Sequence, residues 1–265
     1  LVVPLDAAAK RKPTRGHKAK ASGEVLRVAR EKPKEDKSKK KKDAPRVVEK
    51  RRSREKSNID DIDDEIDILR ELLDIERGSP SEADTLLELS YVLWDRAEAY
   101  EGEAYDEYYT VGLHKAKASK NRKDQHRLRI EQQNLLEQSR STKNEVIDNL
   151  KRIERRFSGF GKLDEVLYAV GYHLNEMERH GEAVDAFFRL VRKVPKSPFI
   201  PDAFLGIGNY YFGKNQGGEA LKWYNKVLSH KKSSVYGWAL YYIAWVQYNQ
   251  QNYKRAVDAF VKVLD

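Results

Sequence analysis

The stretch that decides the fold spans residues 170–195 and reads Val170-Gly171 … Leu174 … Ala183-x3-Phe187-x2-Leu190 … Pro195. The same spacing returns in two later stretches, Ile207-Gly208 … Tyr211 … Ala220-x3-Tyr224-x2-Val227 and Ile243-Ala244 … Gln247 … Tyr253-x2-Ala256-x3-Phe260-x2-Val263. A pattern that returns along a chain indicates repeated structural units. In each copy a small residue precedes the alanine by twelve positions. Both are therefore placed where two antiparallel helices approach closely.

The period indicates the class of repeat. The interval from Ala183 to Ala220 is 37 residues and that from Ala220 to Ala256 is 36, close to the period of about 34 residues in tetratricopeptide repeats (TPRs). A repeated helix pair cannot bury its apolar side alone, so it stacks on its neighbour. We therefore predict an all-α TPR solenoid. The residues predicted to pack the repeats are Gly171, Ala183, Phe187, Gly208, Ala220, Tyr224, Ala244, Ala256 and Phe260.

Charged and aromatic residues are unevenly distributed. Residues 10–56 hold 21 Lys or Arg against 7 Asp or Glu, a balance of +14, whereas residues 57–265 hold 30 against 34. Of the 27 aromatic residues, 19 lie in 163–265, so the core is expected in the C-terminal part. A segment with as little apolar surface as 10–56 cannot offset the entropy lost on ordering. It is predicted to be a disordered basic tail.

Two features bear on the compartment. The chain has no cysteine, so it has no disulfide framework and no thiolate metal site. Residues 1–9 end on Ala7-x-Ala9 after a short apolar run, which is typical of the end of a secretory signal peptide with its cleavage site. The same residues also fit an ordinary chain terminus, and both interpretations stay open. No stretch has the roughly 18 apolar residues that a transmembrane helix needs.

A short amphipathic helix is predicted at 57–78. Aspartates fill its first turns, where they complement the positive end of the helix dipole, and Gly78 followed by Pro80 ends it. Isoleucines interrupt these acidic residues, and the glycine and final glutamate of an EF-hand loop are missing, so no calcium site is predicted. The apolar stripe of this helix consists of Ile59, Ile62, Ile66, Leu69 and Leu73.

The first repeat is predicted to be split within residues 79–157. Residues 79–93 match 197–211 in spacing, and Leu150 and Ile153 take the positions of Phe187 and Leu190. Between the two halves, at about 100–142, lies a charged, helix-forming insertion that we expect to be an extended antiparallel hairpin turning near residues 119–121. It is either an arm that reaches a partner or a solvated spacer. Residues 158–265 are assigned two further TPR units, in an array expected to continue beyond residue 265.

No residue pattern indicates catalysis. The six histidines are scattered, with no two at the spacing of metal ligands. The glycines lack the lysine and hydroxyl residue of a P-loop, and no serine or carboxylate constellation for hydrolysis is present. The sequence therefore predicts a non-enzymatic protein with no catalytic, metal or cofactor site.

The basic tail is a second candidate for binding. Its cations would attract nucleic acid, an anionic membrane or an acidic protein, in a salt-sensitive manner. It has no aromatic residue to stack on bases, and export from the cytoplasm would exclude nucleic acid. The tail also fits a plain spacer between an export signal and the folded array.

The inner face of the array is the third candidate. In helical solenoids the first helix of each pair lines this face, with its outward positions off the core stripe. Aromatic side chains there would give large contact area at low entropy cost. About half of the predicted set is expected to be exposed and the rest packed between repeats. The predicted partner-binding groove consists of Tyr168, Tyr172, Asn175, Leu205, Asn209, Phe212, Trp238, Tyr241, Trp245 and Tyr248.

The stretch Val194-Pro195-x-Ser197-Pro198-x2-Pro201-Asp202-Ala203-Phe204-x3-Gly208-x2-Tyr211 resembles the inter-repeat signature of bacterial envelope TPR proteins, in particular the lipoproteins of outer-membrane assembly. Residues 79–89, followed by a long charged insertion, are similar to the adventurous gliding motility TPR proteins. The resemblance covers residues 79–265. It departs from the pattern at Gln247, where an aromatic is usual, and in the missing lysines of a carboxylate-clamp groove.

The resemblance implies a non-enzymatic scaffold that binds a protein or peptide in its groove. It also implies a place in the bacterial periplasm or on the periplasmic face of the outer membrane. There the chain would belong to a hetero-oligomeric machine of gliding motility or envelope assembly. The alternative is a cytoplasmic TPR adaptor whose basic tail binds nucleic acid or an anionic membrane.

Overall fold

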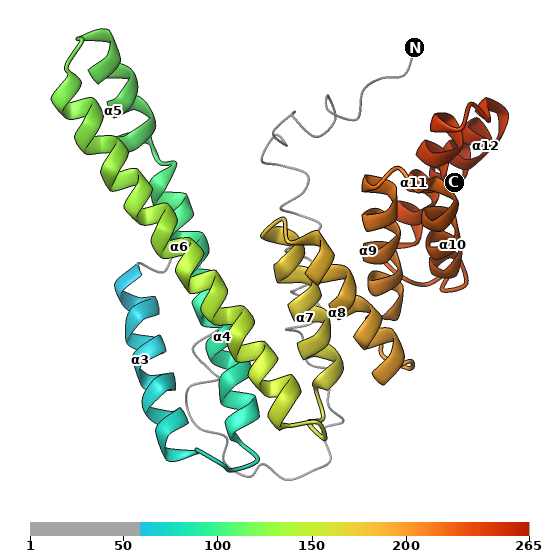
Figure 1. Cartoon of the computed structure of the whole chain (residues 1–265), viewed down its shortest axis with the longest axis horizontal. Coiled ribbons are helices and arrows are strands. Elements are labelled where there is room, and N and C mark those ends of the chain that lie inside the picture. The colour runs from blue at the N-terminus through green and yellow to red at the C-terminus, as the bar shows by residue number, and fades with distance from the viewer. Residues whose placement is uncertain (1–58, 265) are drawn as a thin grey trace. The chain divides into compact units, whose positions relative to one another are not determined.

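A computed structural model describes residues 59–264, which lie within the second of the two units, 1–55 and 56–265, into which the chain divides (Figure 1). The predictions for residues 1–9, for the tail 10–56 and for the first two residues of the amphipathic helix lie outside this range. The described residues form ten α-helices and no strand. In chain order these are α3 (Ile59–Ile75), α4 (Glu82–Ala104), α5 (Glu107–Ala118), α6 (Arg122–Arg156), α7 (Leu163–Glu176), α8 (His180–Lys193), α9 (Ile200–Gly213), α10 (Gly217–Leu228), α11 (Tyr236–Asn249) and α12 (Tyr253–Leu264).

The last six helices form three pairs, α7 with α8, α9 with α10 and α11 with α12, and each pair packs on the next. The predicted all-α TPR array is confirmed. The assignment of two units to residues 158–265 is corrected to three. The last copy of the pattern forms a complete pair, although alanine replaces glycine at position 244 and Gln247 replaces the tyrosine.

The backbone repeats with the same period as the side chains. The turn inside each pair has one residue with positive φ: 60° at Glu178, 59° at Asn215 and 63° at Gln251. Each of these residues is followed by an N–H that donates to a carbonyl five residues back, as from Asn252 to Gln247 at 2.9 Å. Such bonds satisfy the free carbonyls at a helix end. The positive φ residues are 37 and 36 residues apart, like the alanines.

Close contacts between rings and glycines join consecutive pairs. A Cβ atom on Gly171 of α7 would lie 2.4 Å from Phe187 of α8, and one on Gly206 of α9 would lie 2.5 Å from the same ring. Similarly, a Cβ on Gly208 would lie 2.4 Å from the Tyr224 ring of α10. The opposite neighbour of Tyr224 is the stacked ring of Tyr242, 5.5 Å away between centroids. A second-helix ring therefore touches its own first helix and the next one.

The nine residues predicted to pack the repeats include the members of these contacts, Gly171, Phe187, Gly208 and Tyr224. All are buried except Phe260 of α12, which is half-buried. The alanines Ala183, Ala220, Ala244 and Ala256 are at most 2% exposed. Small side chains at these positions therefore permit the helices of each pair to approach closely.

The first repeat consists of α4 and α6, with α5 and the first half of α6 as the insertion (Figure 1). The hairpin turns at residues 119–121, where Lys120 has a φ of 54°. Helix α6 is unbroken over 35 residues, about 52 Å at 1.5 Å per residue. The other arm is interrupted between α4 and α5, because the Asp106 side chain accepts a hydrogen bond from the N–H of Tyr109 and begins a new helix.

The N-terminal helix α3 packs on α4 through the predicted stripe, with Ile62, Ile66 and Leu69 at most 3% exposed. The turn after it uses Gly78, whose φ of 83° favours glycine. The N–H of Gly78 donates to the buried carboxylate of Glu82 at 2.7 Å. No helix within residues 59–264 is both long and apolar enough to span a membrane.

The split repeat joins the array through α7. The rings of Trp94 on α4 and His173 on α7 lie 3.9 Å apart between centroids. The Tyr91 hydroxyl donates to Glu165 at 2.6 Å. Arg152 and Arg156 of α6 both form ion pairs with Glu82 of α4, which hold the base of the hairpin together.

Substitution of Gly208 by leucine is expected to lower the melting temperature by several degrees. The leucine side chain would overlap the Tyr224 ring, and overpacking of this kind costs about 1–3 kcal/mol. Thermal unfolding followed by circular dichroism checks this. Gly213→Leu in the same helix is the matched control, since a Cβ there has no atom within 4 Å. Equal melting temperatures for the two variants would contradict the ring-to-glycine contact.

Candidate partner-binding surface

Helix α11 has an unusual composition for a surface helix, because none of its 14 residues is charged. Its buried side consists of Ala239, Leu240, Ala244 and Val246. On the other side, Trp238, Trp245 and Tyr248 are 44%, 37% and 42% exposed. Large aromatic rings that remain exposed next to one another are typical of an interaction site.

These rings form a connected row with those of the following helix. Tyr241 lies 6.0 Å from Trp238 and 6.2 Å from Trp245, and Trp245 lies 5.7 Å from Tyr248. The contacts are edge-to-face, an arrangement that stabilises aromatic pairs. Each ring is thus fixed by its neighbours before any partner binds. We call this set the aromatic surface: Trp238, Tyr241, Trp245, Tyr248, Tyr253 and Phe260.

The α12 members extend the row beyond α11. Phe260 lies 6.0 Å from Tyr241 and 5.7 Å from Trp245. Tyr253 lies 5.5 Å from Tyr248 and is 56% exposed. Tyr253 is not among the predicted groove residues, because it lies on a second helix and only first helices were predicted to line the groove. Its place directly after the turn, five residues from Tyr248, is the signal that could have identified it.

The groove residues predicted on α7 lie in different environments. Tyr168 is 5% exposed and stacks on Phe199 at 4.7 Å, so its assignment to an open groove is wrong. Burial also raises the pKa of its hydroxyl well above the ordinary value. The loop before α9 brings Phe199 over this ring. Tyr172 is half-buried, and Asn175 is exposed and bonded to the His180 ring at 2.9 Å.

The predicted residues on α9 are all half-buried. Asn209 accepts a hydrogen bond from the Tyr224 hydroxyl at 2.9 Å, so its amide is engaged within the repeat. Phe212 contacts Tyr242 edge-on at 5.8 Å, and Leu205 packs on the core between α10 and α11. The exposed rings of the predicted groove are therefore concentrated on α11.

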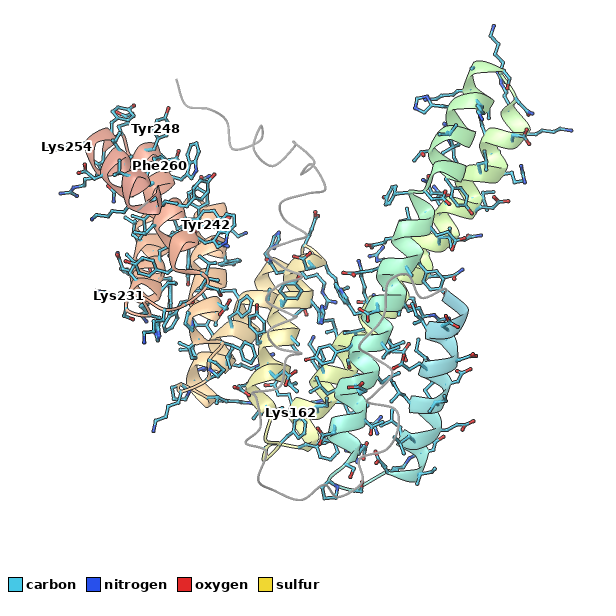
Figure 2. The ribbon with its side chains drawn as sticks, turned by 180° about the vertical axis from the view of Figure 1, so that it is seen from behind. Lys162, Lys231, Tyr242, Tyr248, Lys254 and Phe260 are labelled. Atoms are coloured by element: carbon cyan, nitrogen blue, oxygen red, sulfur yellow. The ribbon has the colours of Figure 1, made fainter. Side chains whose placement is uncertain are left out.

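Cations are placed at both ends of α11. Lys231 lies in the loop before α11, and Lys254 lies in the first turn of α12, after α11 ends (Figure 2). Residues 203–264 hold eight Lys or Arg against two Asp or Glu, a balance of +6. The described structure shows an ion pair for Lys222 and cation–π contacts for Lys214 and Lys226. The aromatic surface is therefore uncharged and belongs to a part of the chain with a net positive charge.

Asp202 is an acidic residue outside the aromatic surface. It lies in the first turn of α9. Burial raises the pKa of its carboxyl group from 3.8 to about 6. The nearby carboxylate also contributes to the raised pKa of the Tyr168 hydroxyl. This aspartate is thus part of the packing between α7 and α9.

Residues 59–264 contain no cluster of His, Asp or Glu that could hold a metal ion. One open hollow of about 660 Å³ lies at the tip of the hairpin, between Val111 of α5 and Leu128 of α6. Another, of about 470 Å³, lies against Phe188 and Arg192 of α8. Neither includes a member of the aromatic surface, which is an open surface and not a cavity.

No protein-family model matches the chain, and no curated protein matches its sequence. Among solved structures it is similar to a crystal structure of MamA protein, with 19% identity over 77% of this chain and 82% of that one, at a TM-score of 0.48. A second crystal structure of MamA has 18% identity, 77% and 88% coverage and a TM-score of 0.47. A putative kinesin light chain of Podosopora anserina with nearly identical TPR-like repeats has 10% identity, 78% and 95% coverage and a TM-score of 0.39.

The helix pairs and their period define the fold as a TPR-type helical repeat array. Folds of this class typically mediate protein–protein interaction, and they are generally not enzymes.

Replacement of Asp202 by asparagine is expected to stabilise the protein at neutral pH. Folding raises the pKa of this carboxyl group. The group therefore favours the folded state at a pH below its unfolded pKa, near 4. This stabilisation is lost as the pH rises through the folded pKa of about 6. The shift of about two pKa units corresponds to at most about 3 kcal/mol. Urea unfolding of both proteins at pH 4 and pH 7.5 checks this. A stability difference that is independent of pH would contradict the assignment.

Proposed function

We propose that this protein is a non-enzymatic scaffold whose aromatic surface binds a segment of another protein, within a bacterial cell-envelope machine. The observation that carries the binding role is α11, a helix without charge that exposes three aromatic rings on one side. Burying such rings against a partner removes apolar area from water, at about 25 cal/mol per Å². Edge-to-face contacts fix the rings in advance, so little side-chain entropy is lost on binding.

A protein segment fits this surface better than a small molecule does. Sites for small molecules are enclosed clefts that bury most of the ligand, whereas these rings lie on an open face. Their row extends along α11 and across to α12, so that an extended or helical segment could contact several rings at once. The net positive charge of residues 203–264 would favour a segment with acidic residues beside its apolar anchors.

The proposed setting is the periplasm or the periplasmic face of the outer membrane, in a complex of gliding motility or envelope assembly. Its support is the resemblance of residues 194–211 and 79–89 to envelope TPR proteins, together with the signal-like ending of residues 1–9. The alternative, a cytoplasmic adaptor whose basic tail binds nucleic acid or an anionic membrane, is favoured by the charge of residues 10–56 alone.

Substitution of Trp245 by alanine is expected to weaken partner binding at least tenfold while leaving the fold intact. Central aromatic residues of interfaces cost about 2 kcal/mol or more when truncated, and about 1.4 kcal/mol corresponds to tenfold in affinity. A photo-crosslinking amino acid at position 245 would first identify the partner in native cells. Calorimetry with the purified partner would then compare the two proteins.

Trp223→Ala is the matched control for this experiment. Trp223 lies on α10, where its half-buried ring contacts Phe188 and Phe204 and is not part of the aromatic surface. This variant should bind the partner like the wild type, provided that its melting curve shows it to be folded. Full affinity in Trp245→Ala, or an equal loss in both variants, would argue against the assigned surface.

The location is tested separately. In cells of the native bacterium, an epitope-tagged chain should be digested by protease once the outer membrane is permeabilised, and a cytoplasmic marker should remain intact. Protection of the tagged chain until the inner membrane is broken would favour the cytoplasmic alternative and would leave the aromatic surface untouched.

A further inference from the structure

The C-terminal helix α12 has one apolar face that no described residue covers. Tyr253, Val257 and Val261 follow one another at intervals of four residues, and are 56%, 59% and 50% exposed. Residues four apart lie on one side of a helix, so these side chains form a continuous strip. Val263 is also 37% exposed. We call Tyr253, Val257 and Val261 the α12 strip.

The equivalent positions of the earlier repeats are covered by the next first helix. Val184 of α8 corresponds to Val257 in the repeat and is only 5% exposed. Gly217 of α10 corresponds to Tyr253, and a Cβ there would lie 3.0 Å from Val246 of α11. Leu221, which also corresponds to Val257, packs on the core between α10 and α11. The α12 strip is therefore a stacking face suited to one further helix.

At the other end of the described chain, α3 has an outward face of complementary character. Ile68 is 54% and Ile75 is 81% exposed, although isoleucines on the opposite side of the same helix pack on α4. Asp61, Asp64 and Glu71 are exposed on the same side as these two isoleucines. We call these five residues the α3 strip.

The charges of the two strips are opposite. Helix α3 holds eight Asp or Glu against one Arg, a balance of −7, whereas α12 holds three Lys or Arg against one Asp, a balance of +2. The larger regions around the two helices differ in the same direction. The net charge is −13 over residues 59–104 and +6 over residues 203–264. Within the described residues, no ion pair engages Lys254, Arg255, Lys262 or the acidic members of the α3 strip. These charges can therefore pair across an interface.

From these observations we propose that the α12 strip of one molecule binds the α3 strip of a second copy of the same chain. Valines would contact Ile68 and Ile75, and the basic residues of α12 would lie against Asp61, Asp64 and Glu71. The α3 helix would take the place that a first helix takes on α8 and α10. Such a contact joins two different faces, so it is a heterologous interface that leaves one free strip at each end of a dimer. The chain should therefore form open oligomers whose length grows with concentration.

Two blocked variants test this proposal in the full chain. Val257→Asp with Val261→Asp removes the apolar part of the α12 strip, and Ile68→Lys with Ile75→Lys does the same for the α3 strip. All four side chains are at least half exposed. Folding should therefore be preserved, and circular dichroism checks that it is. Ile130→Asp is the matched control, since Ile130 is 43% exposed on α6, outside both strips.

Sedimentation velocity over a wide concentration range is the measurement. The wild type and Ile130→Asp should form dimers and longer species, while each blocked variant alone should stay monomeric. An equal mixture of the two blocked variants should form dimers and nothing larger, because only one intact α12 strip and one intact α3 strip remain per pair. Raising the salt from about 0.1 M to about 1 M shortens the Debye length from about 10 Å to about 3 Å, and should therefore weaken the association.

A monomeric wild type at all concentrations would overturn the proposal. So would a blocked variant that still self-associates, a mixture that forms no dimer, or a loss of association in Ile130→Asp. The partner-binding role is tested separately: the two surfaces share Tyr253, but none of the four substitutions alters Tyr253 or Trp245. Trp245→Ala should self-associate like the wild type.

Discussion

The array depends on one type of contact: an aromatic ring on a second helix packs directly against a glycine on a first helix. The ring fills the space that a larger side chain would occupy there. Phe187 lies against both Gly171 and Gly206, where any Cβ would be within 2.5 Å of the ring. Tyr224 makes the same contact with Gly208. Because one ring touches two successive first helices, it fixes the distance within a pair and the stacking between pairs together. A small change at either glycine would therefore affect both.

The last pair follows this rule with a different outcome. Ala244 takes the place of the glycine, and Phe260 packs against Tyr241 and Trp245. The rings that earlier repeats bury between helices are here only partly covered. Helix α11, which has no charged residue, presents Trp238, Trp245 and Tyr248 to solvent.

The fold was predictable from the sequence because the packing residues themselves carry the period: glycine or alanine, then alanine twelve residues later, then a ring. Exposure was less predictable, since it depends on neighbours that have no fixed spacing. Tyr168 has the phase of an outward residue, but Phe199 from the following loop covers it. The interruption at Asp106 depends on one side-chain cap within a helix-forming segment. Glu178 and Gln251 adopt positive φ without a glycine to indicate the turn.

The helices at the two ends of the described array differ from those in its middle in how far neighbouring helices cover them and in their net charge. Between α7 and α10 each helix has a neighbour on both sides, so apolar residues are covered and charges are mixed. At α3 and α12 one side of the helix has no neighbour among the described residues, and these helices differ in the sign of their charge. Apolar area alone would allow any hydrophobic surface to bind there. Opposite charge restricts the match, because joining two α12 strips or two α3 strips would bring like charges together. Selectivity for the unlike pair therefore follows from electrostatics, while the affinity comes from the valines and isoleucines.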